Sequence, residues 1–367
     1  MKRKFNIIGG VATLVIVALG VLAVSVAMNK GTGTGRSVGE NLVMLLSGAV
    51  ISGFICALTH ESGHAVCAKK NGFKIMDFKV WFFRWTDVNG KYVFSFTLPL
   101  YEAGATETVP ETTENIEKRL IKMTSGGLIA SFISMIIGIP ALFFFGKIPF
   151  FVFCLWATFL PIGAYYFFGN ALPMSSEGVL NDGGVIYAVK KNTPEGAVLS
   201  AILKIHAELF SGKTPAEIDE NYYFSVPQIA EDSPYFIDLL TLRYDRFLDE
   251  RDFENAKKTS DRLLTLEDYM SKPVKNLVYS FALYNACTFD FDEDRADDYT
   301  EEIEKYLNSS EDITKLRVKA AYILYVRKEK DVAGEFIEKG LKDALKASLK
   351  GYGRFEEKLF DEMKKDL

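Results

Sequence analysis

Four long runs of apolar residues dominate the first half of the chain. They span about residues 7–28, 41–68, 123–146 and 150–168. Each run is long enough to cross the roughly 30 Å hydrocarbon core of a bilayer as a helix. The pattern therefore predicts a mainly α-helical, polytopic membrane protein with about four transmembrane helices.

The first run allows two interpretations. It follows basic residues at 2–4, and Ser25-Val26-Ala27 would suit a signal-peptide cleavage site. The run is long for a signal peptide, so we favour a retained span. Residues 30–40 then form a short external loop. Lys69 and Lys70 mark the cytosolic end of the second span, because cytosolic ends carry an excess of basic residues.

Residues 73–100 lack the long apolar runs of the spans, and their pattern predicts a small β-hairpin. Two runs rich in aromatic and β-branched residues flank the turn signal at 87–90, which contains Asn89-Gly90. The aromatic side chains favour a hairpin at the membrane interface. It could instead simply pack on the helices. A free strand edge beside an active site could also hold an extended substrate.

From about residue 188 onward the chain is soluble in character. Its apolar residues recur at helical spacing beside charged faces, and the stretches at 243–258 and 321–336 are similar to tetratricopeptide-like helical hairpins. We therefore expect three domains. Residues 1–40 form a transmembrane helix with its loop, 41–190 form a membrane core, and 191–367 form a cytosolic helical domain with a regulatory or docking role.

Charge divides the chain in the same way. Residues 1–184 carry a net charge of +4 and residues 185–367 carry −9, which together make −5. The acidic second half argues against nucleic acid as a partner, because phosphate binding needs concentrated Lys and Arg. The four cysteines lack metal-ligand or C-x-x-C spacing, so we interpret them as small hydrophobic residues.

The strongest chemical signal lies inside the second apolar run. His60, Glu61 and His64 form a His-Glu-x-x-His motif. Histidines four residues apart lie on one face of a helix, where two imidazoles can bind one Zn²⁺ ion. Glu61 is placed to take a proton from a zinc-bound water. Ionisable residues inside a span are costly and indicate a functional site.

A catalytic zinc usually has three protein ligands. The fourth apolar run returns to the cytosolic side just before residues 170–184, where the acidic candidates are Glu177 and Asp182. Asp182 lies between apolar pairs, a setting that an unpaired carboxylate would avoid unless it bound a cation. We therefore favour Asp182 as the third ligand and keep Glu177 as the alternative.

These motifs, in this order, resemble the site-2 protease family of intramembrane zinc metalloproteases. The resemblance covers about residues 41–190 and rests on the histidine motif, on 125–132, and on Asn170-Ala-Leu-Pro173 followed by Asp182-Gly183. It implies that His60, His64 and Asp182 bind zinc, that Glu61 is the general acid and base, and that Asn170 holds the substrate backbone. The chain departs from the family in a longer gap before Asp182 and in Gly127, where proline is usual.

The leading functional hypothesis is therefore an intramembrane zinc endopeptidase acting in regulated intramembrane proteolysis. Its substrate would be a single-span membrane protein or peptide precursor in the lipid bilayer, and the helical domain would bind a protein partner. We expect a multi-pass protein of a bacterial plasma membrane, with the active site and helical domain on the cytosolic side. The alternative is a non-proteolytic, metal-binding membrane scaffold.

Overall fold

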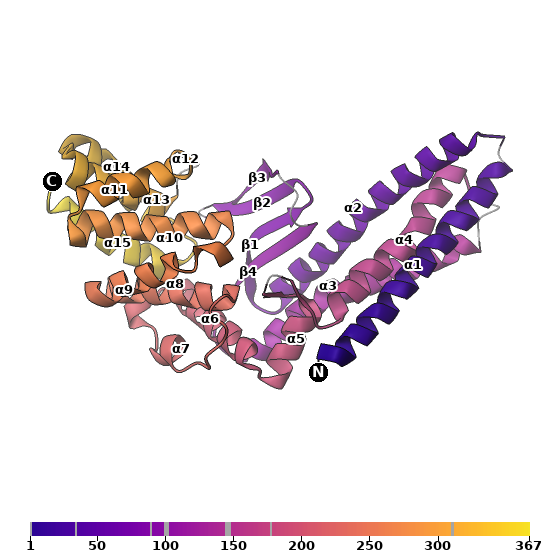
Figure 1. Cartoon of the computed structure of the whole chain (residues 1–367), viewed down its shortest axis with the longest axis horizontal. Coiled ribbons are helices and arrows are strands. Elements are labelled where there is room, and N and C mark those ends of the chain that lie inside the picture. Colours follow the sequence, from indigo (N-terminus) through magenta and orange to yellow (C-terminus); the bar gives the residue numbers. More distant parts are fainter. Residues whose placement is uncertain are drawn as a thin grey trace.

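The computed structural model describes residues 2–33, 35–88, 90–98, 103–143, 148–176, 178–309 and 312–367. For residues 2–8 and 141–142 it describes the backbone only. Figure 1 shows two lobes with a small sheet between them: long helices from the first half of the chain form one lobe, and the C-terminal helices form the other. The predicted mainly helical fold class is confirmed.

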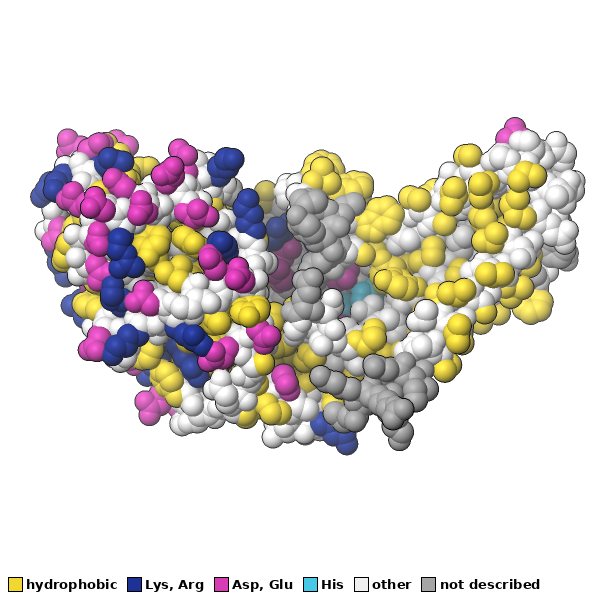
Figure 2. All heavy atoms as spheres, viewed as in Figure 1, with side chains coloured by type: hydrophobic (Ala, Val, Ile, Leu, Met, Phe, Trp, Pro, Cys, Tyr) yellow, Lys and Arg dark blue, Asp and Glu magenta, His cyan; other side chains and the backbone are white. Residues whose placement is uncertain are grey.

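The four predicted spans are all present as long helices. They are α1 (Lys2–Thr32), α2 (Val38–Lys70), α3 (Ile116–Gly138) and α4 (Phe150–Ala171). All four are long and apolar enough to cross a membrane. In Figure 2 charged side chains gather on the C-terminal lobe, whereas hydrophobic side chains cover the long helices. Such an uncharged, apolar surface suits lipid, so the chain is a multi-pass membrane protein.

Small residues let these helices approach closely. A Cβ atom on Gly63 of α2 would lie 2.4 Å from the Gly126 carbonyl oxygen of α3, and one on Gly126 would lie 2.3 Å from the Gly63 carbonyl. Gly48 of α2 meets the backbone of α4 in the same way, at 2.8 Å from the Leu155 nitrogen. Contacts of this kind replace the hydrophobic driving force that is absent between helices in lipid. They fix the backbone that carries the histidine motif.

The β region is larger than the predicted hairpin. It forms an antiparallel sheet in the order β3-β2-β1-β4, from β1 (Phe73–Val80), β2 (Phe83–Val88), β3 (Lys91–Phe96) and β4 (Gly104–Pro110). The β2–β3 pair is the expected hairpin, and its turn includes Gly90 at φ 81°. Asn89 lies outside the described residues. The first aromatic run splits into two strands because Trp81 adopts φ 53°, a turn conformation that the sequence does not signal.

Two helices connect the membrane core to the C-terminal lobe. They are α5 (Asp182–Lys191) and α6 (Pro194–Ser211). Leu199 and Leu203 of α6 pack on a core formed by the end of α2, β1, α3 and α5. Lys204 of α6 also pairs with Glu117 of α3 at 2.9 Å. The first helix beyond the predicted boundary at residue 190 is thus in contact with the membrane core.

The C-terminal lobe contains only helices and turns among its described residues. The helices are α7 (Asn221–Phe224), α8 (Pro234–Asp249), α9 (Phe253–Leu264), α10 (Lys272–Asn285), α11 (Glu293–Glu302), α12 (Glu304–Leu307), α13 (Ile313–Tyr322), α14 (Lys330–Ala344) and α15 (Lys350–Lys364). Two π-helical turns, Ala286–Asp290 and Ile323–Arg327, extend α10 and α13. One shared apolar core runs through α8 to α15.

A repeated backbone feature organises this lobe. Arg251, Phe291 and Lys328 each have positive φ at the turn between two helices of a hairpin. Five residues after each of them lies an alanine with no exposed surface: Ala256, Ala296 and Ala333. The turns recur 40 and 37 residues apart, longer than the 34-residue tetratricopeptide period. The lobe is a set of helical hairpins, and the closer tetratricopeptide likeness stays a prediction.

Candidate active site

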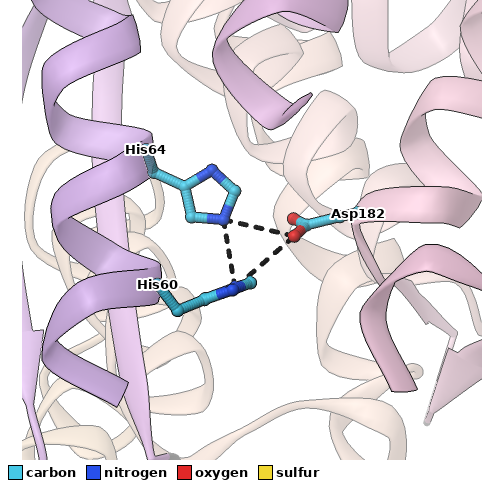
Figure 3. A group of neighbouring side chains, drawn as sticks. All are labelled: His60, His64 and Asp182. Carbon is cyan, nitrogen blue, oxygen red and sulfur yellow. Dashed lines mark hydrogen bonds and ion pairs between the residues drawn. The ribbon is translucent and has the colours of Figure 1, made fainter. Parts of the chain in front are cut away.

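The two histidines of the motif project from one face of α2. Their Nε2 atoms lie 3.2 Å apart, as Figure 3 shows. Residues four apart on a helix are neighbours on its surface, so the regular helix alone produces this pairing. Both side chains are buried, with 5% of His60 and 8% of His64 exposed. The pairing of the two imidazoles was predictable from their spacing.

Asp182 approaches the two histidines from a different element. It is the first residue of α5, and its Oδ2 atom lies 3.4 Å from His60 Nε2 and 3.2 Å from His64 Nε2. In Figure 3 the three side chains point at one another from facing helices. The structure thus brings the three predicted metal ligands together.

The three ligand atoms fit a zinc ion closely. A tetrahedral zinc with ligands at about 2.0–2.1 Å keeps those ligand atoms about 3.3 Å apart. The observed edges of the triangle are 3.2, 3.2 and 3.4 Å. Asp182 Oδ2 is also buried without a hydrogen-bond partner among the described residues. A buried carboxylate oxygen without a donor is costly unless a cation compensates it, so the triangle has both the size and the charge of a zinc site.

The outer ring nitrogens of both histidines contact α3. His60 Nδ1 lies 2.7 Å from Ser131 Oγ, and His64 Nδ1 lies 3.3 Å from the carbonyl oxygen of Met123. A carbonyl only accepts, so the His64 contact requires a proton on Nδ1 and leaves the Nε2 lone pair facing the site. Contacts of this kind orient metal-binding imidazoles.

Asn181 fixes the backbone just before the third ligand. Its Oδ1 atom accepts hydrogen bonds from the backbone nitrogens of Gly184, at 2.9 Å, and Met174, at 3.0 Å. Its Nδ2 atom donates to the carbonyls of Gly169 and Leu172, each at 2.7 Å. The side chain therefore both caps α5 and ties it to the end of α4, which places Asp182 opposite the histidines.

Glu61 lies beside the triangle on α2 and is only 6% exposed. Thr106 of β4 donates a hydrogen bond to Glu61 Oε2 at 2.7 Å. The chain at Gly104 passes so close that an added Cβ would lie 2.7 Å from Glu61 Oε1. Strand β4 therefore covers one side of the Glu61 carboxylate and limits its movement. A buried, oriented carboxylate next to a metal site is suited to proton transfer.

Two further residues, Asn170 and Glu177, were predicted to lie at the site. Asn170, at the end of α4, donates from Nδ2 to the carbonyl of Tyr166 at 2.9 Å. The Tyr166 ring in turn lies 5.8 Å from the His60 ring, centroid to centroid. Asn170 is thus one helical turn from a residue at the site, although no described contact assigns it to substrate. Glu177, the alternative ligand, lies outside the described residues.

Several residues around the site were not singled out from the sequence. Asn181 follows an apolar strand and begins a helix, which is a recognisable capping signal. Ser131 and Thr106 carry no such signal, because they reach the site only through contacts 71 and 45 residues distant in sequence.

Comparison with known proteins agrees with this geometry. A family model described as peptidase family M50 matches residues 48–357, more than half of the chain. Neither the curated proteins nor the solved structures gave a match. The matched range includes all three ligand candidates and most of the C-terminal lobe.

Gly127 offers a direct test of the site. A Cβ atom there would lie 2.2 Å from His64 Nε2, so Gly127→Ala should displace the imidazole and weaken zinc binding about 10- to 100-fold. Gly169→Ala is the matched control, since no atom lies within 4 Å of its added Cβ. Zinc content after dialysis against graded chelator measures the difference. Equal retention by both variants would contradict the assignment of His64.

Asp182→Asn should weaken zinc binding more than about 100-fold, because it replaces an anionic ligand with a neutral oxygen. Loss of a hydrogen bond to a ligand already costs about 10- to 100-fold in metal affinity, and loss of the ligand charge should cost more. Glu177→Gln is the comparison and should retain zinc. Metal analysis of the purified variants decides between them. If the two lose zinc equally, Asp182 is not the third ligand.

Proposed function

The chain belongs to peptidase family M50, the site-2 protease family of zinc metalloproteases, and on this basis we propose that it cleaves a peptide bond in or near a transmembrane segment of its substrate. The substrate would be a single-span membrane protein or a membrane-bound peptide precursor. The observation that carries this proposal is the triangle of His60, His64 and Asp182 beside Glu61, with both histidines and Glu61 on the membrane-length helix α2.

The depth of the site favours a substrate within the membrane. His64 lies six residues and His60 ten residues before Lys70, the last residue of α2. At about 1.5 Å per residue, the histidines are roughly 9–15 Å from that basic end. A site at this depth is reached by a substrate in the bilayer, whereas water must enter from the side of the lobe. In Figure 2 a histidine side chain is visible in the hollow between the two lobes.

Each residue of the site has a role in this reaction. When bound, zinc supplies a Lewis acid for the scissile carbonyl and lowers the pKa of water from about 15.7 to about 7. His60, His64 and Asp182 would hold the ion. Glu61 would take a proton from the attacking water and deliver it to the leaving amine, which requires the buried, oriented position that Thr106 gives it.

The sheet is suited to hold the substrate in an extended form. Strand β4 lies at one end of the sheet and pairs only with β1 among the described strands. We propose that its other edge takes main-chain hydrogen bonds from an added substrate strand, because the same strand contacts Glu61 through Thr106. A substrate helix must unwind before cleavage, because its carbonyls are otherwise bonded. We propose that Asn170 helps to hold the unwound backbone.

Glu61→Gln tests the proteolytic function. It should retain zinc and reduce cleavage about 10²- to 10⁴-fold, the usual contribution of a general acid and base. Co-expressed single-span membrane proteins supply the substrates, and immunoblotting measures their fragments. Glu114→Gln, an exposed position outside the site, is the control and should cleave normally. Zinc retention with undiminished processing in Glu61→Gln would favour the metal-binding scaffold instead.

We also propose a plasma-membrane location with the active site and C-terminal lobe in the cytosol. The support is the basic end of α2 and the basic stretch at 118–122, which would begin α3 on the same side.

A membrane-impermeant thiol reagent tests this orientation. A cysteine introduced by Arg36→Cys should be labelled on intact cells, and one introduced by Glu195→Cys only after the membrane is opened, since both positions are exposed. The unmodified chain corrects for labelling of its own cysteines. Labelling of Glu195→Cys on intact cells would reverse the orientation.

A further inference from the structure

Among the described residues, two sets of hydrogen bonds join the C-terminal lobe to the catalytic core. One contact reaches the loop that precedes Asp182, and the other reaches the sheet that covers Glu61. In Figure 1 the sheet lies between the long helices and the C-terminal helices. The two contacts therefore link the lobe to the third ligand and to the proposed acid and base separately.

The first contact comes from the start of α8. The hydroxyl of Tyr235 accepts a hydrogen bond from the backbone nitrogen of Leu180 at 3.1 Å. Leu180 is two residues before Asp182 and belongs to the short hairpin of Ser175–Ser176 and Val179–Leu180. At its turn Gly178, at φ 82°, packs against Pro234, where a Cβ atom would lie 2.6 Å from the proline Cδ. The loop is thus held by two consecutive residues of the lobe.

Tyr235 is itself fixed by the lobe. Along the same helix, Ile237, Leu240 and Tyr244 are buried in the apolar core that α8 to α15 share. The backbone that carries Tyr235 is thus anchored in the lobe. The Tyr235 hydroxyl therefore ties the Leu180 amide to the lobe.

The second contact comes from the turn between α14 and α15. Ser348 donates from Oγ to Asp87 Oδ2 of β2 at 2.6 Å, and Lys74 of β1 lies 3.2 Å from the same Oγ. Lys74 Nζ is also 2.5 Å from Asp87 Oδ2, and the Asp87 side chain is only 1% exposed. Burial alone would raise the pKa of Asp87, but the bonds from Lys74 and Ser348 keep it below its usual value. The carboxylate is therefore charged and held.

The strands of the sheet connect Ser348 with the active site. Lys74 of β1 is the register partner of Val109 in β4. Three residues earlier in β4, Thr106 donates to Glu61. A shift of the central strands β1 and β2, which Ser348 holds, would thus move the donor that orients Glu61.

We propose that the C-terminal lobe positions the active site, with Tyr235 and Ser348 as positioning residues. Tyr235 holds the loop that presents Asp182, and Ser348 holds the sheet that orients Glu61. A protein that binds the lobe and shifts it changes the rate of cleavage through these two contacts. The expected change in cleavage rate rests on the proposed function. The expected changes in the Asp182 loop and in zinc binding rest on the observed contacts alone.

Tyr235→Phe and Ser348→Ala test the two contacts in the full-length protein. Tyr235→Phe should increase deuterium uptake of residues 174–184 and speed zinc loss to a chelator about 2- to 10-fold, the range expected for one lost hydrogen bond. It should lower kcat by a similar factor and leave KM within about twofold. Ser348→Ala should lower kcat about 2- to 10-fold with zinc loss unchanged, since it acts on Glu61.

Controls separate positioning from general destabilisation. Tyr279→Phe loses a hydroxyl bond to Glu267 within the lobe, and Ser211→Ala loses one to the Glu208 carbonyl. Both should leave kcat, zinc loss and deuterium uptake of 174–184 as in the unmodified protein. If Tyr235→Phe and Ser348→Ala match these controls in all three measurements, the proposal is overturned.

The readouts also distinguish this proposal from the proposed function. If the unmodified protein shows no cleavage that depends on Glu61, the proposed function is wrong. Deuterium uptake and zinc loss of Tyr235→Phe then still decide whether the lobe positions the Asp182 loop. If cleavage depends on Glu61 and both positioning variants match the controls in all three measurements, the proposed function stands and only the positioning role is overturned.

Discussion

The structure depends on one electrostatic constraint, the burial of two imidazoles and a carboxylate oxygen at helices of membrane length. Asp182 Oδ2 has no hydrogen-bond donor among the described residues, and His60 and His64 are almost fully buried. Burying charged groups is costly unless they are paired or bind a metal, so a zinc ion held by these three side chains would offset that cost. The surrounding helices are built to hold the three ligand atoms at the spacing of that ion.

Close packing of α2 and α3 is the first consequence of this constraint. Gly63 and Gly126 let the two backbones touch, and Gly127 leaves room for the His64 ring. The same approach brings Ser131 and the Met123 carbonyl to the outer nitrogens of the histidines. A glycine at 127, where the related family usually has proline, therefore has a physical reason in this chain. Any side chain there would occupy the volume of the imidazole.

Features that depend on residues close together in the chain could be predicted from the sequence, whereas contacts between distant residues could not. The four long helices and the pairing of His60 with His64 depend on neighbours along the chain, and both are confirmed. The zinc metalloprotease family, inferred from motif order, is confirmed by the family match. Strand β4 and its contact with Glu61 were not predicted, because Gly104–Pro110 is a polar segment with no alternating pattern. The turn at Trp81 was missed for a similar reason: an aromatic residue rarely adopts positive φ.

The contacts of the C-terminal lobe with the membrane core could not be predicted from local sequence patterns. The acidic charge and helical periodicity of the lobe predict a separate module, yet Tyr235 meets Leu180 across 55 residues and Ser348 meets Asp87 across 261. Neither contact has a sequence signature, since a tyrosine at a helix start and a serine in a turn are ordinary residues. The Tyr235 contact ends two residues before Asp182, and the Ser348 contact ends on the sheet whose strand β4 contacts Glu61. These attachment points support the proposal that a protein bound to the lobe would affect catalysis.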